Sequence, residues 1–175
     1  MAGHSKWAKV KHQKAVTDVR KSKIFSKLVR FIAVEAKKAK GDRSAPGLRA
    51  AIEKARAANM PSENIDRAIE KASGTGADIE TVMYEAYGPG GAALIIEGYT
   101  DNRNRTGQEI KHLLSQQGGT LATPGAAMWA FTRSEGKLQP TATVDLSEAD
   151  LEALAQLVDA LEEHDDVSEV YTNAA

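Results

Sequence analysis

Apolar residues recur with the period of an α-helix in the first half of the chain. Between residues 17 and 40 they fall at i, i+4, i+7 and i+8, at Ile24, Leu28, Phe31 and Ile32. This spacing places them on one face of a helix, for which Thr17 or Asp18 is the candidate N-cap. Residues 46–58 and 62–73 repeat the pattern with smaller side chains. The pattern therefore predicts three helices with short connections, a compact helical domain over residues 17–74.

Beyond residue 77 the apolar residues form short runs separated by turn residues. Glu80–Tyr87 and Ala92–Thr100 are predicted strands, joined by the glycine-rich hairpin connection 88–91. Further strands are predicted at 125–133, 141–144 and 167–172, with a turn at 134–140. Helices are predicted after Thr100 and after Ser147, where Asp150 completes a capping box. The order β, β, α, β, β, α, β predicts an α+β domain over residues 78–175, with an antiparallel or mixed sheet and two helices.

Charge is divided unevenly between the two halves. Residues 1–74 hold eighteen Lys and Arg against seven Asp and Glu, whereas residues 75–175 hold five against seventeen. The formal net charge of −1 thus hides a cationic front and an anionic back. A cationic surface of this size attracts polyanions, because each neutralised phosphate releases condensed counterions.

The first sixteen residues lack a clear helical period and read as a basic arm. Its lysines are candidates for phosphate contacts: Lys6, Lys9, Lys11 and Lys14. Trp7 lies between two of them, so its ring could stack on a nucleobase; the alternative is that it anchors the arm to the body of the protein.

The first predicted helix carries a nearly acid-free basic stripe opposite its apolar face. Arg20, Lys23, Lys27 and Arg30, with Lys37 further on, fall within one arc at about 100° per residue. A solvated face normally mixes charges of both signs. We therefore interpret this stripe as phosphate-binding, and the alternative is a merely solvated surface.

Arg103 and Arg105 stand in the first turn of the helix that follows Thr100. Cations there oppose the helix dipole by about 0.3–1 kcal/mol each, so something should compensate them. The candidates are carboxylates of the same domain, or a phosphate or another chain.

Catalytic patterns are missing from the chain. It has no cysteine, its four histidines are scattered, and the glycine-rich loop 88–91 leads to a strand and lacks the Lys-Ser/Thr of a P-loop. Four acids surround His164 and could hold a cation weakly, but we interpret them as an exposed acidic helix end: Glu162, Glu163, Asp165 and Asp166. We expect a binding protein with no catalytic residues, no metal site and no cofactor. The absence of a membrane-length apolar run or a signal peptide favours the cytoplasm.

Five blocks of sequence closely resemble the YebC/PmpR family, which includes the mitochondrial translational activator of cytochrome c oxidase. They are MAGHSKWAKVKHQKAVTD, KSKIFSKLVRFI, NMPSENIDRAIEKASG, YEAYGPGGAALIIEGYTDNRNRT and LVDALEEHDDVSEVYTN. They occur in family order over nearly the whole chain.

The resemblance implies an N-terminal helical domain followed by α+β domains, and a role in gene expression in the cytoplasm or an organelle. Family members usually carry a third domain inserted after the strand that is here AAMWAFTRSEG, and this insert is missing near residues 136–140. The expected function is a DNA-binding transcriptional regulator. The alternatives are a translation factor on ribosomal RNA, with the ribosome as partner, and a protein-interaction adaptor. The oligomeric state stays open.

Overall fold

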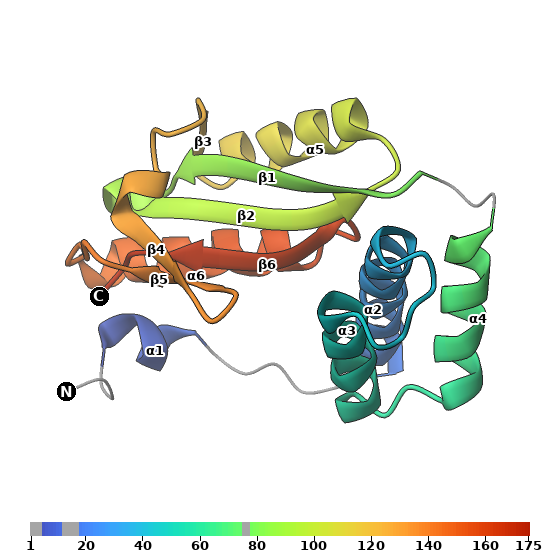
Figure 1. Ribbon diagram of the computed structural model, residues 1–175. Coiled ribbons are helices and arrows are strands. Elements are labelled where there is room, and N and C mark those ends of the chain that lie inside the picture. Colours follow the sequence, from blue (N-terminus) through green and yellow to red (C-terminus); the bar gives the residue numbers. More distant parts are fainter. Residues whose placement is uncertain (1–4, 12–17, 75–77) are drawn as a thin grey trace. The chain divides into compact units, whose positions relative to one another are not determined.

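The computed structural model in Figure 1 describes residues 5–11, 18–74 and 78–175. These residues form two units. The helical unit comprises residues 18–74 with 78–81 and 99–103, and the α+β unit comprises residues 5–11, 82–98 and 104–175. The predicted α+β fold class is confirmed.

Three helices make up most of the helical unit: α2 (Asp18–Lys38), α3 (Pro46–Ala57) and α4 (Ser62–Ser73). Their predicted apolar stripes meet in one core, where Ile32, Leu48 and Ile65 are almost completely buried. The buried stripe of α2 is narrower than predicted, because Ile24 and Val29 are exposed. Thr17, a candidate cap of α2, lies outside the described residues.

A close approach between Glu35 and Gly47 joins α2 to α3. A β carbon at Gly47 would lie 2.1 Å from Oε2 of Glu35. The carboxylate therefore reaches the first turn of α3, whose N-cap Ala45 supplies no side-chain hydrogen bond. A negative charge near a helix N-terminus is stabilising, so the position of Glu35 favours the start of α3.

The α+β unit is built on a four-stranded sheet with the order β3-β1-β2-β6. The strands are β1 (Glu80–Tyr87), β2 (Ala93–Thr100), β3 (Thr120–Ala122) and β6 (Val167–Thr172). β3 pairs antiparallel with β1, and β6 pairs antiparallel with β2. The 3-10 turn η1 (Pro89–Gly91) connects β1 to β2.

Helices α5 (Arg103–Gln116) and α6 (Glu148–Glu162) pack against one face of this sheet. Leu94 and Ile96 of β2 meet Ile110 of α5 and Leu154 of α6 there, all essentially without solvent exposure. The predicted cap is present, because Ser147 Oγ accepts a hydrogen bond from the backbone N–H of Asp150.

The other face of the sheet is covered by the hairpin of β4 (Phe131–Ser134) and β5 (Lys137–Pro140). The predicted strand 125–133 is wrong for residues 125–130, which form a loop and the 3-10 turn η2 (Met128–Ala130). The reason is the carboxylate of Glu85, which binds backbone N–H groups that a strand would donate to a neighbour.

Two further predictions in this region are also wrong. The predicted turn 134–140 shrinks to two residues, Glu135 and Gly136, both with positive φ, as in a tight hairpin. The predicted strand 141–144 is replaced by one isolated bridge between Val144 and Ala174.

Part of the predicted arm is a short helix, α1 (Lys6–Val10), capped by Ser5. Trp7 and Val10 are partly buried against the α5–α6 core. The backbone N–H of Trp7 donates a hydrogen bond to the carbonyl oxygen of Ala175 at 3.0 Å. Residues 5–11 therefore belong to the α+β unit. Over the described parts of the chain, every helix is too short or too polar to cross a bilayer.

Candidate nucleic-acid interface

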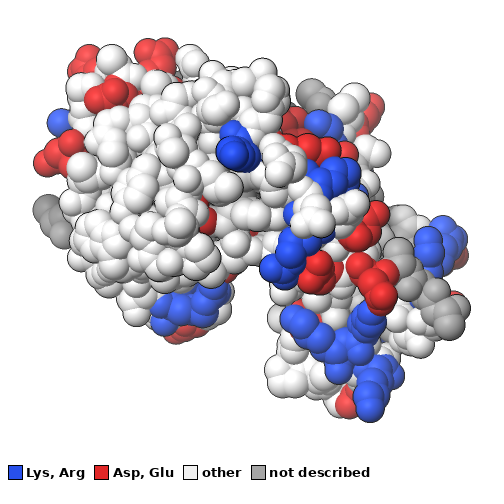
Figure 2. Space-filling view, turned by 90° about the horizontal axis from the view of Figure 1, so that it is seen from above, with Lys and Arg blue, Asp and Glu red and all other residues white. Residues whose placement is uncertain are grey.

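The helical unit carries a surplus of exposed cations. In the view of Figure 2, Lys and Arg side chains gather on this unit, and most of the visible face of the α+β unit carries no charge. Over the described residues of this unit, eleven Lys and Arg side chains are exposed, against eight acidic ones. The exposed cations are Lys21, Lys37, Lys38, Lys40, Arg43, Arg49, Lys54, Arg56, Arg67, Lys71 and Arg103.

The basic stripe of α2 is less accessible than the sequence suggests. Arg20, Lys23, Lys27 and Arg30 are all half-buried, and each already takes part in an interaction within the protein. Lys37 is exposed and forms an ion pair with Asp78. Phosphate binding by the stripe stays a prediction, and it would require these cations to exchange partners.

A second group of cations is exposed on α3 and α4. Arg49 and Arg56 are seven residues apart on α3, and Arg67 and Lys71 are four apart on α4, so each pair shares a helix face. Within the described residues, none of the four forms an ion pair. Sequence analysis missed these α3–α4 cations, because acids interrupt them and only their spacing of seven and four residues could have revealed them.

Of the arm residues, Lys6 and Lys9 are exposed on α1. Lys11 forms an ion pair with Glu162 of α6, with Nζ and Oε1 at 3.0 Å. Lys14 lies outside the described residues. Trp7 packs against the core, which is the geometry of an anchor, although part of its surface stays accessible.

Arg103 and Arg105 both contact carboxylates of their own chain. Arg103 donates to Glu80 from Nη2 at 3.1 Å, with both side chains more than half exposed. Arg105 bridges two acids, with Nη1 2.9 Å from Glu109 and Nη2 2.8 Å from Asp166. Since Asp166 is 2% exposed, the acids after α6 are not simply an exposed helix end.

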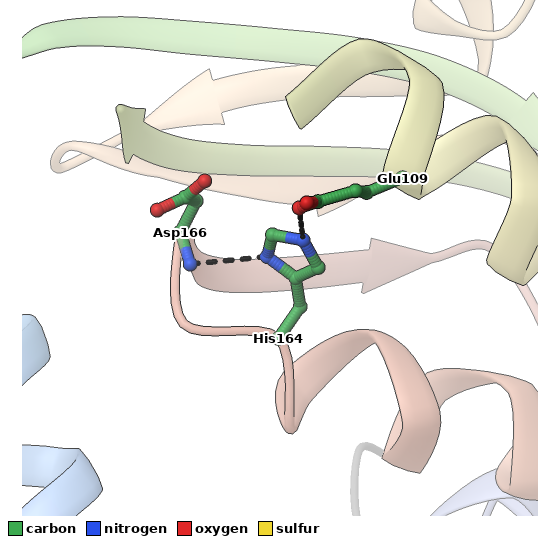
Figure 3. A group of neighbouring side chains, drawn as sticks. All are labelled: Glu109, His164 and Asp166. Atoms are coloured by element: carbon green, nitrogen blue, oxygen red, sulfur yellow. Dashed lines mark hydrogen bonds and ion pairs between the residues drawn. The ribbon is translucent and has the colours of Figure 1, made fainter. Parts of the chain in front are cut away.

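His164 lies between the same two acids, as Figure 3 shows. Its Nδ1 accepts the backbone N–H of Asp166 at 3.1 Å, which leaves the ring proton on Nε2, 2.6 Å from Glu109 Oε2. The hydrogen bond from His164, together with Arg105, holds the pKa of Glu109 below its ordinary value despite the opposing effect of burial. Thr106 Oγ1 completes the network by donating to Asp166 at 2.7 Å.

This network resembles a metal site in composition only. Ligand atoms of Glu109, His164 and Asp166 lie within 4.8 Å of one another. However, a protonated Nε2 offers no lone pair to a metal, and the guanidinium of Arg105 already supplies the positive charge between the two carboxylates. The arrangement is suited to fixing α5 to the segment between α6 and β6.

Trp129 is exposed and is held in place by hydrogen bonds, which the sequence did not predict. Glu85 is 6% exposed and accepts backbone N–H bonds from Gly125, Ala127 and Met128 at 2.6–2.8 Å. The Tyr87 hydroxyl donates to the carbonyl oxygen of Ala126 and accepts the Trp129 Nε1–H at 3.1 Å. Trp129 is thereby held with 62% of its surface exposed.

Comparison with known proteins identifies the family. A model described as "TACO1/YebC protein N-terminal domain" matches residues 5–75, and one described as "TACO1/YebC second and third domain" matches residues 79–136 and 131–174. The chain therefore belongs to the TACO1/YebC family, the YebC/PmpR family indicated by its sequence blocks.

Individual relatives agree with this assignment. A probable transcriptional regulatory protein of Thermosipho africanus is 39% identical over 235 residues, which cover 99% of this chain and 93% of that protein. A protein of the same name from Thermotoga maritima is 52% identical over 136 residues, covering 76% of this chain and 54% of the relative. The crystal structure of the conserved hypothetical protein Aq1575 from Aquifex aeolicus matches with a TM-score of 0.85 and 32% identity, covering 98% and 97% of the two chains. The family is thus one of probable transcriptional regulators.

Proposed function

We propose that this protein is a nucleic-acid-binding regulator of gene expression that acts by binding and not by catalysis. The observation that carries the proposal is the surplus of exposed cations on the helical unit, in a chain whose relatives are named probable transcriptional regulatory proteins. Contacts from Lys and Arg to phosphates supply most of the affinity of such proteins, and they position a protein without reading sequence.

Three separate groups of cations are the proposed phosphate contacts. On the helical unit they are the α3–α4 cations, which are the most accessible, and the α2 stripe after exchange of its present partners. On the α+β unit they are the exposed arm lysines Lys6 and Lys9. Arg103 and Arg105 contribute less, because their carboxylate partners would have to be displaced. Duplex DNA is the proposed target, and ribosomal RNA is the alternative.

The first test is binding of the purified protein to labelled duplex DNA and to ribosomal RNA fragments between about 50 and 200 mM salt. We expect the nucleic-acid binding constant to fall steeply as the salt concentration rises. The slope of its logarithm against the logarithm of salt should correspond to several phosphate contacts. A flat salt dependence, or no retention at low salt, would contradict the proposal. Salt-sensitive self-association without nucleic-acid retention would instead favour the adaptor alternative.

A second experiment separates the two nucleic-acid targets. Cell lysate is run on a sucrose gradient with and without ribonuclease. Co-migration with ribosomes that ribonuclease disrupts would favour the translation factor. Migration at the top of the gradient, with specific retention of promoter fragments over bulk competitor DNA, would favour the transcriptional regulator.

We further infer that the chain lacks one domain of its longer relatives. The alignment with the Thermosipho protein spans 235 positions against 175 residues here, so at least 60 positions face gaps. The two matches to the "second and third domain" model meet at residues 131–136, next to the β4–β5 turn. Both observations support an insertion point at Glu135 and Gly136. Grafting the extra residues of the relative there should leave the unfolding transition of the α+β unit intact.

A further inference from the structure

Among the described residues, α1 and Lys11 contact the rest of the α+β unit in three ways. Trp7 and Val10 pack against the core, and the backbone N–H of Trp7 donates to the carbonyl oxygen of Ala175. Lys11 forms an ion pair with Glu162. None of the five α1 residues is fully buried, and the side chains of the ion pair are 41% and 33% exposed. A segment with so little burial can detach at a small fraction of the cost of global unfolding.

The attached position is unfavourable for binding a polyanion. Lys6 and Lys9 are exposed, but Lys11 is engaged by Glu162, and Glu163 follows directly at the end of α6. A phosphate that approaches Lys11 in this position meets the carboxylate of Glu162 as well. The same lysines, once away from α6, would bind phosphate without that repulsion.

A ligand shifts a conformational equilibrium only by its difference in affinity for the two states. The carboxylate of Glu162, which is paired with Lys11 in the attached position, creates such a difference. On this basis, and resting on the proposed function, we propose that α1 is a latch: nucleic acid competes with Glu162 for Lys11, and its binding releases α1 from the α+β unit.

The first test uses a matched pair of charge changes on α6. Glu162→Gln removes the partner of Lys11, whereas Glu152→Gln makes the same change at an exposed position of the same helix. We expect Glu162→Gln to tighten binding of a labelled duplex DNA about two- to fivefold at low salt, the range of a half-exposed ion pair. Glu152→Gln should change it far less. Equal tightening by both variants would mean that only net charge matters and would overturn the latch.

The second test observes α1 directly. Trp7 and Trp129 are the two tryptophans of the chain, so Trp129→Phe leaves Trp7 as the sole reporter. Saturation with the same DNA should move the emission of Trp7 to longer wavelength and increase its quenching by acrylamide. In the absence of DNA, Glu162→Gln should produce part of the same change.

The two tests separate the latch from the proposed function. DNA could bind saturably without any change in Trp7 emission, or with a loss of Trp7 intensity but no shift of its emission maximum. Either result would overturn the latch and leave the proposed function standing. If the unmodified protein did not bind DNA or RNA at low salt, both proposals would fail.

Discussion

Gly98 lies directly against the backbone of Asp166: a β carbon at Gly98 would stand 2.1 Å from the Asp166 carbonyl oxygen and 3.0 Å from its carbonyl carbon. The contact coincides with an irregularity in the β2–β6 pairing, where Glu97 pairs with Glu169 and Gly98 with Val167. Glycine at this point lets the chain place the carboxylate of Asp166 beneath Arg105 and Thr106.

Gly98→Ala is expected to destabilise the α+β unit, because the atoms in the way are backbone and cannot rotate aside. The loss in the free energy of unfolding should be about 2–4 kcal/mol, in the range of overpacked sites. Gly107→Ala is the control, since the nearest atoms there are at an ordinary 3.7 Å and alanine favours a helix. Urea unfolding followed by circular dichroism measures both, and equal stability of the two variants would contradict this account.

Glu85→Gln should destabilise the loop that holds Trp129. Burial by itself raises the pKa of Glu85, but the N–H bonds from Gly125, Ala127 and Met128 together lower it below the ordinary 4.5. A lowered pKa in the folded state stabilises the protein above pH 4.5, and this contribution is lost as the pH falls from 4.5 through the folded-state value.

The free energy of unfolding of Glu85→Gln should therefore lie about 1–3 kcal/mol below that of the unmodified protein at pH 7. The difference should shrink as the pH drops from 5 to 3. Denaturant unfolding across this range checks the prediction, with Glu152→Gln as a solvent-exposed control. A difference that stays constant with pH would show that the charge of Glu85 is unimportant.

Arg105→Ala and Arg103→Ala form a matched pair of neighbouring arginines. The former leaves the buried carboxylate of Asp166 without its cation and should cost about 2–3 kcal/mol of unfolding free energy. The latter breaks the exposed pair with Glu80 and should cost less than about 1 kcal/mol. Thermal unfolding in low and high salt measures both, and a larger loss for Arg103→Ala would refute the assigned roles.

The two groups of cations on the helical unit can be compared through the salt dependence of nucleic-acid binding. Replacing Arg49, Arg56, Arg67 and Lys71 by Ala should flatten the slope by about three, at roughly 0.7–0.9 per phosphate contact. Replacing Lys23, Lys27 and Arg30 by Ala should flatten it less, because these side chains are half-buried and engaged. Glu53→Gln, in the middle of α3, should tighten binding instead. Unchanged slopes for both variants would exclude these two groups of cations as phosphate contacts.

Local sequence patterns predicted those helices and strands whose structure depends on their own residues. The periodic apolar residues of α2 and α6 and the short apolar runs of β1 and β6 predicted helices and strands close to those observed. The strand prediction for residues 125–130 was wrong because the carboxylate of Glu85, forty residues earlier in the chain, accepts hydrogen bonds from their backbone N–H groups. Such a long-range contact leaves no periodic signal in the segment that it shapes.

The candidate site was less predictable for a related reason. The basic helix is evident from the sequence, but the half-burial of Arg20 and Lys27 is not. Lys and Arg contribute the same charge to a sequence pattern whether they are exposed or already bonded within the protein. From the sequence, the partners of Arg105 could be predicted only as carboxylates of the same domain, and not as Glu109 and Asp166. Which acid is buried depends on the close approach of Gly98 to Asp166, which no spacing rule reveals.

The tight turn at Glu135 and Gly136 has an evolutionary consequence. Its two residues contribute no side chain to the core, and the ladder from Phe131–Pro140 to Ser134–Lys137 closes without them. A gene rearrangement that adds or removes a whole module between these two codons would leave every buried contact of the sheet in place. At the proposed insertion point, such a joint would let the domain content change while the remainder of the protein keeps folding.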